Sequence, residues 1–539
     1  MVNHDPKRGT IITGGPAYPL VKGHVGTVEA VRIDDRRLTH IGSLASARAL
    51  GDAQEVDLDG RTILPGFVDA HTHPLMYGQC ASWADLTSAS SVDEVIKLLG
   101  EHARNESRSV APIRGFGYDH HRLTEGRHPT ALELDRVADD RTVTVMHVSG
   151  HGFSVNSHGL AEADITAATA TPPGGVIDRD EDGRPLGRVF DAACDLLTGP
   201  DGVKVRNHGP NFHLPESSEV LDRMLDLGQQ LIVGAGITSV GDCQVSEREM
   251  DNWLRARDNG RLRLRATLMV LSSHLGHLAA LGLSSHLGDE RLRLGGVKLY
   301  ADGALTGGTA YVPCGCAVNH RDGYLFHDPE EYEGLLVAAH ELGLQTATHA
   351  QGPIPIQMVI DAVSEAQRRN PRPDARHRIE HCGFPSDEQI AAIAAAGIVP
   401  VPQPTQVHLY VEGALRDYGE IAERMYPSGL FADAGVPVVL SSDTPVTMPD
   451  VFTSMWAAVT RRTSAGRVVG PECAIDRITA LRGYTIEGAR ALHREHLVGS
   501  LEPGKLADLV IVDRDPMSVE IDDLPELRVE QAWVGGRPA

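Results

Sequence analysis

The feature that most constrains the fold is a regular alternation of strand-like and helix-like segments in the second half of the chain. Short runs rich in β-branched residues alternate with longer amphipathic stretches such as 329–342, 356–369 and 386–396. Units of this length favour parallel strands joined by helices, and eight such strands favour an α/β fold of the closed (β/α)8 TIM-barrel type. With a first strand around Ile63, the predicted strands are 237–243, 262–270, 294–301, 344–350, 377–382, 398–403 and 436–443.

Residues 64–74, with the sequence LPGFVDAHTHP, place two histidines at the end of the first predicted strand. In an extended strand, residues i and i+2 point to the same side, so the imidazoles of His71 and His73 can reach one metal ion. An isolated His-x-His pattern is also common in ordinary loops. Here a Pro-Gly step and an aspartate precede the pair and a proline follows it, which makes the context far more specific.

Four further polar residues lie within or at the ends of later predicted strands. Lys298 lies inside an apolar strand, where an ammonium group is costly unless it is paired or neutralised. Two explanations remain open: Lys298 pairs with a carboxylate such as Asp302, or it is a neutral amine that reacts with carbon dioxide to form an anionic carbamate. His349 and His381 end successive strands, and Asp443 ends the last strand, where it could instead cap the following helix.

Taken together, these motifs resemble the amidohydrolase superfamily, whose barrel begins with the pattern PGxxDxHxH. The stretch GSLEPGKLADLV at 499–510 is similar to the C-terminal signature of the same superfamily. The segments VKLYADGAL and SSDTPV, with a long insertion after the first strand, look most like the branch that contains N-substituted formamide deformylases and YtcJ-like proteins (amidohydrolase family 3). One departure is the sequence HAQGP from His349 onward, because many relatives carry a Gly-Asp step after this histidine.

The resemblance implies a centre with two divalent ions, most simply zinc, bridged by a carbamate that forms from a lysine and carbon dioxide. One ion would be held by the His-x-His pair, the aspartate and the carbamate, and the other by the carbamate and the two later histidines. A hydroxide bridging the ions would attack the substrate carbonyl, and Asp443 would accept its proton and pass it to the leaving nitrogen. The implied metal ligands are His71, His73, Lys298, His349, His381 and Asp443.

These inferences predict a metal-dependent amidohydrolase that cleaves a carbon–nitrogen bond other than a peptide bond, of the amide or N-formyl type. One alternative is a mononuclear deaminase of an aminated heterocycle, in which His71, His73, His349 and Asp443 hold one ion and Lys298 is not carboxylated. A second alternative is a catalytically silent binding protein with the same fold. Such relatives tend to lose ligands, whereas none is missing here.

Three residues are predicted to contact the substrate. His151 ends the segment HVSGH, which follows a strand and resembles a segment that lines the active site in this branch. Tyr118, in the segment GFGYD, is a candidate hydrogen-bond donor from another wall, and Asp302 is the third. The adjacent pair His120-His121 is expected to be solvated rather than ligating.

Composition constrains the partners and the compartment. The chain of 539 residues exceeds the usual size of one domain, and its formal net charge of -23 argues against nucleic acid or an anionic membrane surface as a partner. No signal peptide or membrane-spanning apolar run is apparent, and the 7 scattered cysteines favour a reducing cytoplasm. We therefore expect a cytoplasmic protein with a small-molecule substrate, and a homodimer is the assembly to test.

These elements divide the chain into five parts. Strand-like segments near both ends are expected to combine into one small composite β-domain that the barrel interrupts. An insertion, with a helix-like stretch at 91–103 and a hairpin around Asp182-Gly183, is expected to cover the barrel mouth. The predicted boundaries are 1–60 for the N-terminal part of the β-domain, 61–77 for the first barrel strand and metal motif, 78–222 for the insertion, 223–496 for the rest of the barrel and 497–539 for the C-terminal part of the β-domain.

Overall fold

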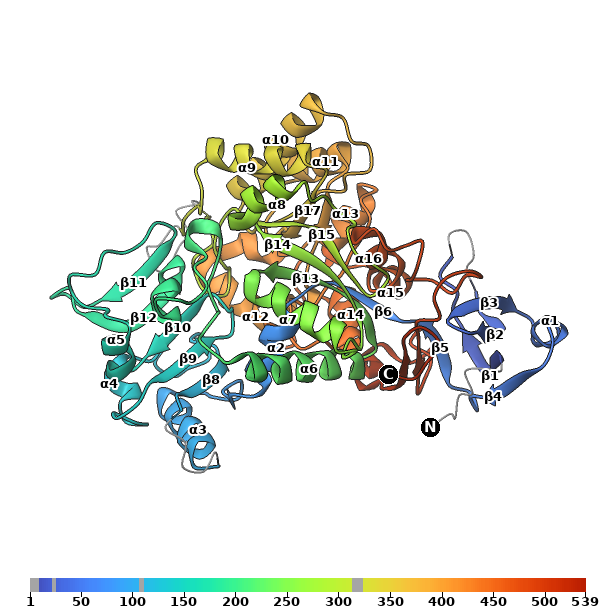
Figure 1. Ribbon diagram of the computed structural model, residues 1–539, viewed down its shortest axis with the longest axis horizontal. Helices are drawn as coiled ribbons and strands as arrows, with labels where there is room; N and C mark the ends of the chain where they lie inside the picture. The colour runs from blue at the N-terminus through green and yellow to red at the C-terminus, as the bar shows by residue number, and fades with distance from the viewer. Residues whose placement is uncertain (1–8, 22–25, 106–110, 313–322) are drawn as a thin grey trace.

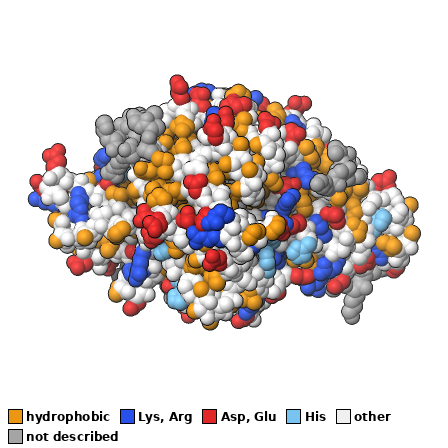
Figure 2. All heavy atoms as spheres, turned by 90° about the horizontal axis from the view of Figure 1, so that it is seen from above, with side chains coloured by type: hydrophobic (Ala, Val, Ile, Leu, Met, Phe, Trp, Pro, Cys, Tyr) orange, Lys and Arg blue, Asp and Glu red, His pale blue; other side chains and the backbone are white. Residues whose placement is uncertain are grey.

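The protein contains three β-sheets, and the central one is entirely parallel (Figure 1). The structure is a computed structural model that describes residues 9–21, 26–105, 111–312 and 323–539. In Figure 1 the parallel sheet and its helices form the middle of the molecule, with the sheet of the insertion on the left and the sheet of β1 to β5 on the right. On the face shown in Figure 2, acidic and basic side chains are interspersed.

Seven strands build the parallel sheet, and they correspond to predicted barrel strands. Each neighbouring pair is parallel, and every residue of these strands is buried. Burial on both faces accounts for the continuous apolar runs in the sequence. In sheet order the strands are β18 (Val399–Val401), β17 (Arg378–His381), β16 (Gln345–Ala350), β15 (Leu292–Tyr300), β14 (Arg265–Leu271), β13 (Ile237–Val245) and β6 (Phe67–Thr72).

The segment predicted as an eighth strand at 436–443 closes the sheet without forming a regular strand, so that part of the prediction is wrong. The amide of Ser441 donates to the carbonyl of Pro402 at 3.2 Å, and the amide of Asp443 donates to the carbonyl of His71 at 2.9 Å. Between them, the amide of Leu440 donates to Gly483, outside the sheet, which interrupts the ladder. The segment therefore joins the two edges of the sheet at separate points, and the barrel is nearly closed.

The first predicted barrel strand is also two strands rather than one. β5 (Thr62–Pro65) pairs with strands of the terminal sheet, and β6 begins the parallel sheet after Gly66. A Cβ atom at Gly66 would overlap the side chain of Thr238 in β13. The Pro-Gly step is thus the joint where the chain passes from one sheet into the other.

Strands from both ends of the chain form one seven-stranded sheet. β19 pairs antiparallel with β5 and with β20, and β1 connects β5 to β2. Its members are β1 (Gly9–Ala17), β2 (Val28–Asp34), β3 (Arg37–Gly42), β4 (Ala53–Asp57), β5, β19 (Leu509–Val512) and β20 (Val529–Trp533).

The insertion forms a sheet of its own, and the predicted hairpin is present within it. β11 and β12 pair antiparallel, and Gly183 in the turn has a φ of 78°, which glycine adopts without strain. In sheet order the strands are β11 (Gly175–Arg179), β12 (Pro185–Asp191), β10 (Gly152–Val155), β9 (Val143–His147), β8 (Ile113–Tyr118) and β7 (Ala84–Asp85). The loop between β9 and β10 reaches the cavity described below.

Helices cover the outside of the parallel sheet (Figure 1), and the three helices predicted between barrel strands are present. They are α9 (Pro329–Glu341), α10 (Pro353–Arg369) and α11 (Asp387–Ala396); the side chains of Asp328 and Ser386 cap α9 and α11. The other described helices of eight or more residues are α2 (Pro74–Ala81), α3 (Val92–Asn105), α6 (Ser218–Gly234), α7 (Glu247–Asp258), α12 (Pro404–Tyr418) and α14 (Val451–Thr460). The shorter ones are α1 (Leu44–Ala49), α4 (Ala131–Leu134), α5 (Ser157–Glu162), α8 (Leu275–Leu281), α13 (Ser428–Asp433), α15 (Arg477–Gly483) and α16 (Ile486–Ala491).

Two observations bear on redox state and membranes. The five described cysteines are buried and none forms a disulfide among the described residues, while Cys314 and Cys316 lie outside the part that the structure describes. Within the described ranges, every helix is too short or too polar to span a bilayer.

Helices α2 and α6 approach each other closely through two glycines. A Cβ atom at Gly78 would overlap the backbone carbonyl of Met224, and one at Gly228 would overlap the backbone carbonyl of Pro74. Because both obstacles are backbone atoms, neither can rotate away. This contact packs the helix that follows the His-x-His motif against the helix that leads into β13.

We expect Gly228→Ala to lower the melting temperature, because an extra methyl group in a packed contact costs about 1–3 kcal/mol. The matched control is Gly234→Ala at the end of the same helix, where a Cβ atom would meet nothing within 4 Å. That change should be neutral or slightly stabilising, because alanine favours helices. Thermal unfolding followed by circular dichroism measures both, and equal melting temperatures for the two variants would contradict the close contact.

Candidate active site

The side chains predicted as metal ligands line one cavity at the C-terminal ends of the parallel strands. They come from five separate segments of the barrel, which lie far apart in the sequence. Side chains at this end of parallel strands converge because the strands all run in the same direction. The residues that the structure brings together are His71, His73, Lys298, His349, His381 and Asp443.

The His-x-His pair lies against Asp443. The Oδ1 atom of Asp443 is 3.4 Å from Nε2 of His71 and 3.3 Å from Nε2 of His73, and these three side chains form a group that could hold a metal ion. Gln406 donates to Oδ2 of Asp443 at 3.1 Å. Burial alone would raise the pKa of Asp443, but the hydrogen bond from His73 and the interactions with His71 and Lys298 outweigh it and lower the pKa, so the carboxylate is ionised.

Backbone hydrogen bonds hold these groups in register. The buried carboxylate of Asp69 accepts hydrogen bonds from the amides of Ser442 at 3.1 Å and His71 at 3.3 Å. The amide of His73 donates to the carbonyl of Thr444 at 2.9 Å. The aspartate of the PGxxDxHxH pattern thus joins the first strand to the closing segment, and it fixes the position of the histidines relative to Asp443.

A buried ion pair fixes the ring of His71. Its Nδ1 atom lies 2.5 Å from Oε2 of Glu380, and Nε and Nη2 of Arg378 each lie 2.7 Å from an oxygen of Glu380. All three side chains are at most 1% exposed. A carboxylate on one ring nitrogen orients the imidazole and leaves the other nitrogen for a metal ion.

His349 and His381 are oriented in the same way. Nε2 of His349 lies 2.9 Å from the carbonyl oxygen of Gly303, and Nδ1 of His381 lies 2.7 Å from Oε1 of Gln403. Their ring centroids are 4.5 Å apart. Burial lowers the pKa of both imidazoles well below the usual value, so both are neutral, which is the form that binds metal ions.

Lys298 is fully buried beside these rings. Among the residues that the structure describes, no group forms a hydrogen bond with its Nζ atom, which lies 4.7 Å from the centroid of the Tyr300 ring. Burial lowers the pKa of Lys298, which favours the neutral amine. The alternative pairing with Asp302 is not formed. The Nζ atom of Lys298 thus has no hydrogen-bond partner among the described residues, and three imidazoles with fixed orientations surround it. This arrangement fits a metal centre that bound ions would complete.

The predicted substrate contacts differ in their positions. His151 lines the cavity, with Nδ1 at 2.6 Å from Oδ1 of Asp191 and its ring centroid 5.3 Å from that of His349. Tyr118 and Asp302 do not line it. For these two residues, substrate contact stays a prediction without support from the geometry.

Asp302 instead organises the loops around the site. Its Oδ1 atom accepts a hydrogen bond from the amide of Gln351 at 2.9 Å, and its Oδ2 atom accepts from the amides of Gly352 and Tyr311, both at 3.0 Å. Burial raises its pKa to about 7, although these hydrogen bonds act in the opposite direction. It joins the loop after β15 to the start of α10.

Sequence reasoning missed the residues that orient the ligands. Arg378 and Glu380 are charged residues two apart in a buried strand, so their side chains share one face, and this pattern could have identified the pair. Gln403 and Gln406 follow β18, at the same end of the sheet as the histidines. Their glutamine side chains gave no comparable signal, because glutamine at a strand end is common.

The expectation that His120 and His121 are solvated is wrong. Nδ1 of His120 lies 3.1 Å from Nε2 of His147, and Nε2 of His121 lies 3.0 Å from Oδ2 of Asp417. Both rings are only partly exposed, because segments that are distant in the sequence pack over them.

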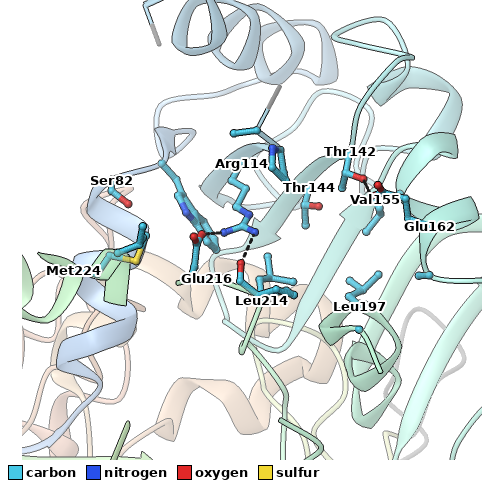
Figure 3. A pocket seen from close by; sticks show the side chains of 18 of the residues that line it. Ser82, Arg114, Thr142, Thr144, Val155, Glu162, Leu197, Leu214, Glu216 and Met224 are labelled. Atoms are coloured by element: carbon cyan, nitrogen blue, oxygen red, sulfur yellow. Dashed lines mark hydrogen bonds and ion pairs between the residues drawn. The ribbon is translucent and has the colours of Figure 1, made fainter. Parts of the chain in front are cut away.

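A larger cavity of about 600 Å³ lies elsewhere, between the insertion and α6 (Figure 3). There Arg114 forms an ion pair with Glu216 and donates to the carbonyl of Pro215 at 3.1 Å. Leu197, Leu214 and other apolar side chains form much of the wall. None of the predicted metal ligands lines it, so size alone does not identify the active site.

Comparison with known proteins agrees with the geometry of the barrel cavity. The model of the amidohydrolase family matches residues 54–539. The N-substituted formamide deformylase of Arthrobacter pascens is 30% identical over 547 residues, covering 96% of this chain and 97% of that protein. The putative amidohydrolase YtcJ of Bacillus subtilis (strain 168) is 26% identical, covering 97% of this chain and 98% of that protein. A crystal structure of an uncharacterized metal-dependent hydrolase from Pyrococcus horikoshii OT3 superposes with a TM-score of 0.76 at 24% identity, covering 95% and 99% of the two chains.

The family match spans most of the chain, and it includes every segment that contributes to the barrel cavity. The protein therefore belongs to the amidohydrolase family and is a hydrolase that acts on carbon–nitrogen bonds other than peptide bonds.

Proposed function

We propose that the protein cleaves an amide or N-formyl bond of a small molecule in the barrel cavity. The observation that carries the proposal is the convergence of four imidazoles, a buried amine and a carboxylate on that one cavity. Similarity to an N-substituted formamide deformylase over nearly the whole length supports the N-formyl class in particular.

The donor set fits a centre with two divalent ions, with zinc as the first choice. His71, His73 and Asp443 would hold one ion, and His349 and His381 would hold the other. Lys298 would complete both sets as a carbamate, formed when its neutral amine adds to the carbon of carbon dioxide and loses a proton. When bound, such ions polarise a substrate carbonyl and lower the pKa of water.

We assign the proton transfer to Asp443. Its Oδ1 atom faces His71 and His73, while Gln406 holds Oδ2. An ionised carboxylate in this position can accept a proton from the attacking water, and it can deliver that proton to the leaving nitrogen. Gln406 restricts rotation of the carboxylate group, so the oxygen that faces the histidines keeps its place.

The rest of the lining would orient the substrate. Asp191 holds Nδ1 of His151, which leaves the other ring nitrogen to contact the substrate carbonyl. Met76, Phe212 and Leu305 contribute apolar surface, which suits an uncharged N-substituent. This lining favours a neutral amide over a charged peptide terminus.

A product assay with the purified full-length protein tests the substrate class. N-formyl amines, other N-acyl amines, cyclic imides and aminated heterocycles are compared, with formate and ammonia measured as separate products. Formate release from N-formyl amines is the expected result. Ammonia release from aminated heterocycles alone would support the mononuclear deaminase instead, and no turnover of any class would favour a silent binding protein.

We expect Asp443→Asn to lower kcat by about 10²–10⁴-fold, because the amide cannot take up the proton. Asp450→Asn is the matched control, because Asp450 caps α14 through its side chain and asparagine caps helices equally well. Steady-state kinetics, with metal content and circular dichroism measured on the same samples, gives the answer. Unchanged turnover in Asp443→Asn would refute the proton-transfer role.

We expect Lys298→Met to remove metal from the barrel and to lower kcat by more than about 100-fold. Loss of a residue that only supports a metal ligand already costs up to about 100-fold. Methionine keeps the length and apolar stem of the buried side chain, so the fold should survive. Elemental analysis and kinetics measure the two effects. A variant with wild-type activity and metal content would point to the mononuclear alternative, in which Lys298 is not a ligand.

A further inference from the structure

Three histidines of the insertion converge at a second place, apart from the barrel ligands. His120 follows β8, His147 ends β9, and His128 lies in the loop between these strands. Each offers one ring nitrogen, and the three nitrogens lie within 4.8 Å of one another. His128 and His147 are buried and His120 is partly buried. None of the three lines the barrel cavity.

The spacing of two of these nitrogens is close to that of nitrogens sharing a small cation. Nδ1 of His120 is 3.1 Å from Nε2 of His147. Two nitrogens that share a tetrahedral zinc ion, each about 2.0–2.1 Å from it, are about 3.3–3.4 Å apart. At this distance the two rings also share a hydrogen bond, in which one nitrogen must accept. At least one of the two rings is therefore neutral, as a metal ligand must be.

Hydroxyl groups orient two of the rings. The hydroxyl of Tyr118 lies 3.0 Å from Nδ1 of His128, and the hydroxyl of Ser149 lies 2.9 Å from Nδ1 of His147. Engagement of one ring nitrogen by a hydrogen-bonding partner is how proteins hold the other nitrogen toward a metal ion. Tyr118, predicted from the sequence to contact the substrate, is placed to orient His128.

The cluster borders a cavity with space for an additional ligand. This cavity of about 200 Å³ is lined by His120 and His128, and also by Asp178 and Asp417. We propose that His120, His128 and His147 bind one divalent transition-metal ion, with a water molecule from this cavity as the fourth ligand. Three imidazoles select zinc, cobalt or nickel over calcium and magnesium, which prefer oxygen ligands.

The proton balance of binding can be followed at His147. The backbone amide of Ser149 donates to Nδ1 at 3.2 Å, so in this arrangement the ring carries its proton on Nε2 and donates it to His120. The metal-binding tautomer carries its proton on Nδ1, where the Ser149 hydroxyl oxygen can accept it and the Ser149 amide gives up its bond to the ring. Binding thus moves one proton from Nε2 to Nδ1 through solvent, and this ring releases none overall.

The second site would also support the wall of the barrel cavity. Ser149 and His151 line that cavity, and the amide of His151 donates to the hydroxyl of Ser149 at 3.2 Å. A metal ion on His147 would therefore anchor the loop that presents His151. The proposal itself does not rest on the function proposed for the barrel.

Metal content of the full-length protein tests the proposal. Wild type and variants are stripped with a chelator, reloaded with zinc, freed of excess metal and measured by elemental analysis. His120→Gln and His128→Gln should each lose one equivalent of zinc relative to wild type. The control His158→Gln makes the same change at a partly exposed histidine of the insertion and should lose none. The double variant His71→Ala/His73→Ala should lose barrel zinc and retain this equivalent.

A crystal of the zinc-loaded wild type, with anomalous data at the zinc edge, supplies a measurement that does not depend on variant folding. A peak between the three rings is expected. Wild-type zinc content in His120→Gln and His128→Gln, or no such peak while the barrel site is occupied, would overturn the proposal. Zinc that is lost only in the cluster variants, and never in the barrel variants, would support this site and refute the metal centre of the proposed function.

Discussion

Everything at the barrel cavity depends on how the closing segment meets the first barrel strand. The amide of Asp443 bonds to the carbonyl of His71, the amide of His73 bonds to the carbonyl of Thr444, and Asp69 joins the two segments from one side chain. These bonds complete the barrel, and the same bonds place two imidazoles against one carboxylate. The same contacts therefore close the fold and assemble this part of the site, which explains why the Asp69 position and the His-x-His pair occur in a single short motif.

Buried charge inside the barrel gives the site its rigidity. Arg378 and Glu380 are fully buried and pair with each other, and Glu380 also bonds to His71. Removing one partner of such a pair typically costs about 3–5 kcal/mol, because the other charge is left uncompensated. Arg378 also donates to the carbonyl of Ala70 at 2.9 Å, next to His71 in the chain. The histidine ring is thus fixed through both its side chain and its own strand, and little freedom remains for it to lose on binding a ligand.

The sequence was informative wherever a local pattern decides the structure, and less so where distant contacts decide it. Alternation of apolar runs and amphipathic stretches predicted the parallel strands. The polar residues within or at the ends of these strands identified the six predicted metal ligands, which line the cavity. The segment at 436–443 is irregular because Leu440 bonds to Gly483, and no local pattern encodes that partner. Asp302 is an acidic residue just after a barrel strand, which suggested a substrate contact. Its carboxylate instead accepts hydrogen bonds from three backbone amides in two loops. His120 looked solvated because its hydrogen-bond partner His147 lies on another strand, 27 residues along the chain.

The loop from His147 to His151 connects the histidine cluster of the insertion to the barrel cavity, so the insertion supports part of the cavity wall. His147 points into the cluster of the insertion, while Ser149 and His151 line the barrel cavity. Ser149 contacts both neighbours, since its hydroxyl lies 2.9 Å from Nδ1 of His147 and accepts from the amide of His151 at 3.2 Å. His151 lies on a loop of the insertion, and loops are the most mobile part of a fold. Contacts that fix this loop are therefore needed if His151 is to orient a substrate. Asp191 holds the ring of His151 and the hydroxyl of Ser149 accepts from its backbone amide, so two contacts within the insertion fix the position of His151.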